Sequence, residues 1–160
     1  MANIQLNTRF GELSIDPAKI ITFPNGIPGF ENNKKWTLFH EVDENGEWIS
    51  GVVVHLLSID DGRIALPLTD PGLFGYSYEI ELSDSDAAEL KLEDPNDMLV
   101  LATLSDNNST PHSVATLPET NIYANIAAPI LINTKSQTGM QKLLVGNKKA
   151  KVKFTTELAL

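Results

Sequence analysis

The sequence predicts an all-β protein: a small, closed or nearly closed β-barrel, mainly antiparallel, with one short helix. Three observations lead to this fold class. Short apolar segments rich in β-branched residues alternate with turn signals along most of the chain. Only one segment carries the start signals of a helix. The nearly continuous apolar run 98–104 is typical of a strand at the centre of a core. Many short strands of this kind bury their edges best by closing into a barrel.

The first half of the chain reads as a series of hairpins. We expect its strands at 4–7, 12–15, 19–23, 36–42, 48–57 and 63–68. Asn45-Gly46 is the strongest short hairpin signal in the chain, and Asp60-Asp61-Gly62 marks the following turn. Strands joined in this way form an antiparallel meander.

The second half begins with the predicted helix, over 83–92. Ser83 can cap its first N–H groups, and the acids that follow stand where the helix dipole favours them. Lysines alternate with apolar residues over 149–154, a pattern typical of an amphipathic edge strand. We also expect strands at 113–117, 122–126, 130–132 and 141–145, with the last pairing on 130–132 across the loop 134–139. No linker divides the chain, so we expect a single β-barrel domain over residues 1–160.

The stretch 20–31 organises the rest of the chain. Its two prolines exclude a helix or a central strand, and its two glycines supply the positive φ angles that consecutive turns need. Ile27 and Phe30 are apolar residues inside these turns. They either plug one end of the barrel or remain exposed as anchors for a partner. We favour the plug.

Composition limits the class of protein. The chain has 160 residues, 42% of them hydrophobic and 21% charged, which is ordinary for a globular domain. It has no cysteine, no apolar run of membrane length and no secretion signal at its start, so we expect a soluble cytoplasmic protein. Residues 1–133 carry a net charge of −14 and residues 134–160 one of +5. This acidic body either attracts basic partners or serves only to keep the protein soluble.

Reactive constellations are missing from the sequence. His40, His55 and His112 are far apart and lack the spacing of metal ligands. No phosphate-binding loop and no nucleophile elbow occurs. An acidic barrel lacks the basic groove that would hold a nucleic acid. We therefore expect no catalysis, no metal, no cofactor and no direct contact with nucleic acid or membrane. A protein-binding module is the remaining class.

Four stretches, in matching order and spacing, resemble the FliW family of flagellar assembly factors, and together they span about residues 8–145. They are Thr8-Arg9-Phe10-Gly11-Glu12-Leu13, Phe23-Pro24-Asn25-Gly26-Ile27-Pro28-Gly29-Phe30-Glu31, Leu57-Ser58-Ile59-Asp60-Asp61 with Asp70-Pro71 after it, and Asn125-Ile126-Ala127-Ala128-Pro129-Ile130-Leu131-Ile132-Asn133. Segment 47–58 is longer than in typical members and lacks their glutamine, so the chain resembles a divergent member.

The resemblance implies a non-catalytic regulator of flagellum biogenesis on a β-barrel. Such a protein binds the RNA-binding repressor CsrA, which relieves repression of flagellin mRNA, and it binds flagellin as a cytoplasmic chaperone. The alternative is a β-barrel interaction module with a different partner. Within the matching stretches, the expected partner-binding residues are Ile27, Phe30, Glu31, Ser58, Asp60, Asp61 and Asn133. We expect Glu31, Asp60 and Asp61 to act in partner encounter rather than in folding.

Overall fold

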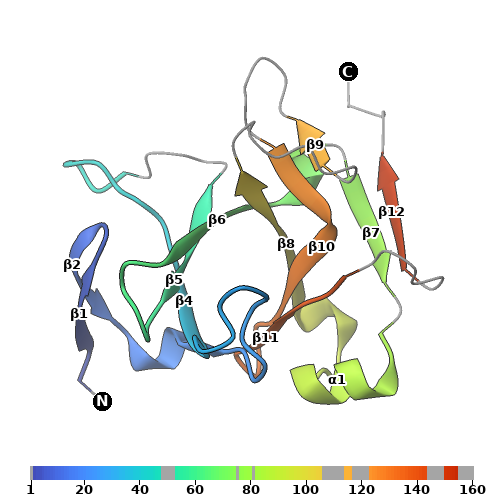
Figure 1. The fold of residues 1–160 in the computed structure, drawn as a ribbon, viewed down its shortest axis with the longest axis horizontal. Coiled ribbons are helices and arrows are strands. Elements are labelled where there is room, and N and C mark those ends of the chain that lie inside the picture. Colours follow the sequence, from blue (N-terminus) through green and yellow to red (C-terminus); the bar gives the residue numbers. More distant parts are fainter. Residues whose placement is uncertain are drawn as a thin grey trace.

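Seven strands close a barrel in the order β11, β3, β4, β5, β6, β8, β10 and back to β11 (Figure 1). The structure is a computed structural model that describes residues 2–47, 53–74, 76–80, 82–105, 114–116, 123–143 and 150–154. The strand pairs around the barrel are antiparallel except β11 and β3, which run parallel. The bounds of these strands are β3 (Ile21–Thr22), β4 (Lys35–Phe39), β5 (Val54–Ser58), β6 (Ala65–Thr69), β8 (Met98–Ser105), β10 (Tyr123–Asn133) and β11 (Thr138–Gln141). The predicted barrel is confirmed, and it is closed.

Further elements flank the barrel. A hairpin lies on one side and a two-stranded ribbon on the other, and the helix α1 lies below the ribbon in Figure 1. The hairpin is β1 (Ile4–Thr8) with β2 (Gly11–Ile15), the ribbon is β7 (Tyr76–Ile80) with β12 (Ala150–Phe154), α1 is Asp84–Leu90, and β9 (Val114–Thr116) extends the sheet beside β10. Short 3-10 helices occur at Pro17–Lys19, Pro71–Phe74 and Pro95–Asp97.

The core follows from the alternation of side chains along each strand. Every second residue points into the barrel, and the inward set is almost wholly apolar. The main core cluster consists of buried strand residues together with two residues of the β3–β4 connection, Phe23 and Ile27; the strand residues are Ile21, Trp36, Leu56, Leu68, Leu101, Ile130 and Ile132. On the outer face, the hairpin β1–β2 covers a second cluster around Ile15, Leu57 and Ala65. Strand β8 lies between β6 and β10, as its continuous apolar run predicts.

Two predictions in the second half were wrong. The expected strands 122–126 and 130–132 are parts of one strand, β10, which pairs with β8 on both sides of a register shift between Asn125 and Ile130. Strand β11 begins earlier than expected, at Thr138, so Gly139 belongs to a strand and not to a loop. A Cβ on Gly139 would lie 2.5 Å from the Phe23 ring. The neighbouring residues therefore predict a turn at Gly139, but this glycine is needed because a side chain there would collide with the Phe23 ring.

Other boundaries shift by a few residues. The expected strand 19–23 shortens to β3, because Asp16 caps a 3-10 helix that holds Lys19. Strand β5 covers the end of the expected strand 48–57, whose residues 48–52 lie outside the described part of the chain. The same holds for 113, 117, 122 and 144–145 at the ends of later strands.

The helix and the last strand agree with the prediction. The Ser83 hydroxyl accepts a hydrogen bond from the Asp86 N–H at 3.1 Å, and the helix ends at Lys91 in the left-handed conformation (φ 54°). The predicted lysine-rich strand is β12. It pairs with β7, a strand that the sequence analysis did not predict. In the described residues, no helix combines the length and apolarity needed to cross a membrane.

Candidate functional site

The connection between β3 and β4 consists of successive turns. The Gly26 N–H donates to the Phe23 carbonyl at 2.8 Å, and the Phe30 N–H donates to the Ile27 carbonyl at 2.6 Å. Gly26 and Gly29 have φ angles of 67° and 91°, in the region that side chains with a Cβ rarely adopt. The predicted use of both glycines is confirmed.

We call residues 23–34 the turn segment, and its apolar side chains fold back onto the core. Ile27 is only 2% exposed and belongs to the main core cluster. Phe30 is half-buried, and its ring meets Trp36 edge to face with 6.2 Å between centroids. Phe23 meets the other part of Trp36 at 6.3 Å. Ile27 therefore serves the core, whereas Phe30 still presents part of its ring to solvent.

The loop between β5 and β6 is bonded directly to the turn segment. The Ser58 hydroxyl, fully buried, donates to the Asn33 side-chain oxygen at 2.7 Å. The Asp60 carboxylate accepts the backbone N–H groups of Lys34 at 2.7 Å and Lys35 at 3.1 Å. Asp60 thus fixes the start of β4, a structural role that the sequence did not predict.

Asp61 is satisfied within the same loop, residues 58–63, which we call the acidic loop. One carboxylate oxygen accepts the Arg63 backbone N–H and its Nε–H, and the other accepts from Arg63 Nη2 at 2.8 Å. These hydrogen bonds and the positive charge lower the pKa of Asp61 from 3.8 to about 2. Its carboxylate is therefore ionised at any ordinary pH, although Arg63 offsets its charge locally.

Glu31 is the third predicted acid, and it lies in the turn segment. Its exposed carboxylate accepts the Gly29 N–H at 3.0 Å. Hydrogen bonds from the backbone N–H of Gly29 and of Glu31 itself lower the pKa of this carboxyl. Glu31 lies in the turn segment and Asp60 and Asp61 lie in the acidic loop, two segments that are hydrogen-bonded to each other, and we call these three residues the acidic end.

Asn133 lies elsewhere. It is 2% exposed, and its amide donates to the carbonyls of Leu90 at 2.8 Å and Lys91 at 3.1 Å. Its oxygen accepts the N–H groups of Lys135 and Ser136. All these partners belong to the end of α1 or the turn after β10. Asn133 therefore connects α1 to the barrel through buried hydrogen bonds and is not part of the acidic end.

Sequence reasoning missed a hollow of about 300 Å³ between the turn segment and α1. Asn25 spans one side of it by donating to Glu89 at 2.6 Å, while Lys142 pairs with Asp86. Its lining residues are Asn25, Gly26, Pro28, Glu31, Asp86, Glu89, Met140 and Gln141. The spacing of Asp86 and Glu89, which places them on one helix face, was the available signal.

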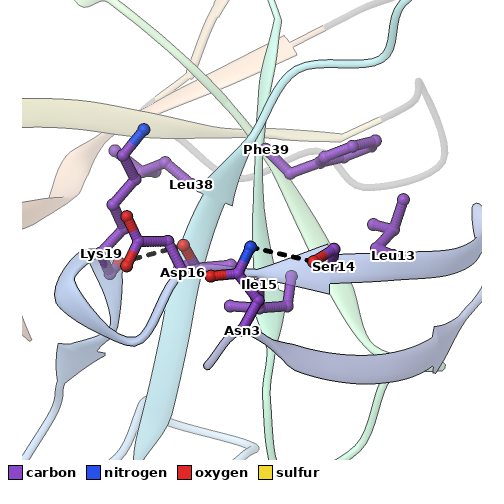
Figure 2. A pocket seen from close by; sticks show the side chains of 9 residues that line it. Asn3, Leu13, Ser14, Ile15, Asp16, Lys19, Leu38 and Phe39 are labelled. Carbon is purple, nitrogen blue, oxygen red and sulfur yellow. Dashed lines mark hydrogen bonds between the residues drawn. The ribbon is translucent and has the colours of Figure 1, made fainter. Parts of the chain in front are cut away.

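A second hollow, of about 200 Å³, lies between the hairpin β1–β2 and strand β4 (Figure 2). Ser14, which accepts a hydrogen bond from Asn3 at 3.0 Å, lies on the hairpin side, and Leu38 and Phe39 lie on the β4 side. The lining mixes apolar groups with one acid and one base. No sequence motif marked this hollow.

The arrangement offers little for reaction chemistry. In the described ranges, no three His, Asp or Glu side chains come together as a metal site would require. The acids of the acidic end are held by backbone N–H groups or by Arg63, so each has a structural partner. An exposed acidic surface next to a half-buried aromatic ring can bind a basic protein surface.

Comparison with known proteins gives one consistent result. Residues 5–156 match the model of a family described as FliW protein. A flagellar assembly factor FliW from Thermosipho africanus is 35% identical over 150 residues, which is 94% of this chain and 93% of that protein. The FliW of an Azoarcus species is 34% identical over 135 residues, 84% of this chain and 86% of that protein. A crystal structure of the flagellar assembly factor FliW superposes with a TM-score of 0.71 at 23% identity, covering 94% and 96% of the two chains, and shows the same fold.

Proposed function

This chain belongs to the FliW family, and we propose that it acts as a flagellar assembly factor by binding two proteins in turn. One is a CsrA-type translational repressor and the other is flagellin. The observation that carries the proposal is the extent of the family match, which covers residues 5–156 and nearly the whole of a relative named for this role. The predicted family membership is thereby confirmed.

The charge of the molecule supports a basic first partner. A repressor that binds RNA needs a positively charged surface, because it must neutralise the phosphates of the RNA backbone. The chain carries a net charge of −9, and the acidic end contributes three carboxylates from two hydrogen-bonded segments. Docking there brings opposite charges together and places negative charge where the RNA backbone would otherwise approach.

We infer that the two partners compete. Flagellin that has not yet been assembled occupies the protein and releases the repressor, which then silences flagellin mRNA. Flagellin exposes apolar surface in this unassembled state, and a half-buried ring such as Phe30 is the kind of anchor that such a surface meets. Binding would then chaperone unassembled flagellin and also make repression of its mRNA depend on the amount of flagellin present.

The proposed residues divide into two groups. Glu31, Asp60 and Asp61 steer the encounter, and Phe30 adds apolar contact. Ile27 and Ser58 act indirectly, from buried positions in or beside the turn segment, and Asn133 fixes α1 against the barrel. The whole chain, residues 1–160, works as one domain in the cytoplasm, where both partners are synthesised, and needs no metal or nucleotide.

The first test measures association of the purified protein with monomeric flagellin and with the repressor, each with and without a chelator. We expect binding to both at micromolar concentrations, competition between them and no effect of the chelator. If neither partner associates, the alternative of a barrel with a different partner takes the place of this proposal.

The second test removes charge from the acidic end and keeps one acceptor oxygen on each of the three side chains. The triple variant Glu31→Gln, Asp60→Asn, Asp61→Asn should slow association with the repressor roughly tenfold at low salt and less at high salt. The matched control removes the same number of charges from exposed acids elsewhere: Glu12→Gln, Glu44→Gln, Glu47→Gln. Equal slowing in both variants would mean that net charge matters but its position does not.

A further inference from the structure

The chain contains two Asn-Gly turns that share a backbone hydrogen-bond pattern. In one, the Gly26 N–H donates to the Phe23 carbonyl at 2.8 Å, and in the other the Gly46 N–H donates to the Asp43 carbonyl at 2.9 Å. Both glycines have positive φ angles, 67° and 80°. The asparagine precedes the glycine at the same place in each turn. Any difference in reactivity between the two turns must therefore come from their surroundings.

Those surroundings differ sharply. The Asn25 amide donates to the Glu89 carboxylate at 2.6 Å, and Gly26 is buried so tightly that a Cβ would lie 2.7 Å from the backbone of Glu31. Both asparagines are exposed, but the Asn45 side chain makes no hydrogen bond within the described part of the chain. A Cβ on Gly46 would meet nothing within 4 Å. A hydrogen bond to Glu89, which we call the clamp, holds the Asn25 side chain, and no such bond holds the Asn45 side chain within the described residues.

We propose that Asn45 is a site of spontaneous deamidation and that the clamp on α1 protects Asn25 from the same reaction. The backbone nitrogen of Gly46 loses its proton and attacks Cγ of Asn45. The new C–N bond closes a five-membered succinimide, and the Cγ–Nδ2 bond breaks to release ammonia. Water then opens the ring at either carbonyl, which leaves aspartate or isoaspartate. The overall reaction consumes one water molecule and involves no oxidant.

Glycine makes this attack possible because it has no side chain to crowd the nitrogen and little barrier to rotation. In both turns the N–H to carbonyl bond must open first, so that cost cancels between them. Asn25 has two further obstacles. Its Cγ can reach the nitrogen only after the amide leaves the Glu89 carboxylate, and Gly26 has no room to shift.

The product changes the loop that joins β4 to β5. It adds a negative charge among Asp43, Glu44 and Glu47, and isoaspartate lengthens the backbone by one atom. The present turn depends on a hydrogen bond from the Asp43 N–H to the Glu47 carbonyl at 2.8 Å and on two further N–H groups that bond to the Asp43 carboxylate. The lengthened backbone cannot keep all of these bonds. Deamidation therefore makes the connection both more acidic and looser.

The test incubates the folded full-length protein in warm, mildly alkaline buffer and follows each site by peptide mapping. Protein isoaspartate methyltransferase with labelled methyl donor is the probe for isoaspartate. We expect Asn45 to react at least about tenfold faster than Asn25, because a charge-assisted hydrogen bond holds only the latter. In the denatured chain the two sites should react at similar rates.

Two variants on α1 separate the clamp from the turn. Glu89→Ala should raise the rate at Asn25 several-fold and leave Asn45 unchanged, whereas Glu89→Gln keeps an acceptor oxygen and should protect Asn25. Asn45→Gln should abolish the main product. Equal rates at both asparagines in the folded protein would overturn the proposal, and so would an inert Asn45 in a chain whose denatured form reacts.

Discussion

The turn segment and the acidic loop lie side by side, yet they are held in place by different forces. The turn segment is anchored by apolar side chains that reach the core, with Phe23 fully buried and Ile27 nearly so. The acidic loop is anchored by hydrogen bonds that nearby backbone N–H groups and the Arg63 guanidinium donate to the carboxylates of Asp60 and Asp61. The first depends on burial and the second on charge.

This difference teaches where the molecule tolerates change. Removing a buried side chain costs the transfer free energy and leaves a cavity, whereas an exposed hydrogen bond is partly replaced by water. Substitutions of the buried residues of the turn segment, Phe23 and Ile27, should therefore unfold the protein before they inform on binding. The acidic loop is where binding can be altered in a folded protein.

Phe23→Ala should have the largest effect. The ring is fully buried between Trp36 and the space left by Gly139, so its loss should lower the free energy of unfolding by about 3–5 kcal/mol. Chemical denaturation of the purified variant measures this. A loss below about 1 kcal/mol would show that the turn segment is not anchored by burial.

Phe30→Ala should cost less, about 2 kcal/mol, because the ring is only half-buried. The variant should remain folded and bind flagellin more weakly than the parent protein. Thermal unfolding and a binding isotherm on the same sample check both effects. A near-native melting temperature with lost binding would mean that Phe30 is purely a partner anchor, contrary to the plug interpretation.

Asp60→Ala should cost about 1–2 kcal/mol, because the N–H groups of Lys34 and Lys35 lose a charged acceptor. Asp60→Asn retains an oxygen and should cost less than the alanine variant. We expected Asp60 to act in partner encounter rather than in folding, so this measurement separates the two roles. If the parent protein, Asp60→Ala and Asp60→Asn are equally stable, Asp60 contributes only through its charge and not to folding.

The smallest effect concerns Asp61 and pH. Because its pKa is lowered from 3.8 to about 2, the stabilisation from its pairing with Arg63 is fully present above the ordinary value and disappears as the pH falls through about 2. Titration of the Asp61 carboxyl carbon by NMR should give the lowered pKa, and Arg63→Gln should raise it. An unperturbed titration in the parent protein would show that the ion pair does not form in solution.

The sequence by itself determined what depends on near neighbours. The positive φ angles of Gly26 and Gly29, the Ser83 cap and the turn at Asp43 each follow from steric or hydrogen-bonding properties of a few adjacent residues. The alternation of apolar residues determined the strands and hence the barrel. Ordered motifs determined the family. All of these are present in the chain before it folds.

Only the tertiary structure decided which polar residues serve the surface and which serve the interior. Asn133 resembles a site residue in sequence, but folding brings it to the carbonyl of Leu90, 43 positions earlier, where its amide is buried and satisfied. Ser58 meets Asn33 across 25 positions in the same way. A buried polar group is tolerated only when it has a hydrogen-bond partner, and residues this far apart in the sequence become partners only in the folded chain.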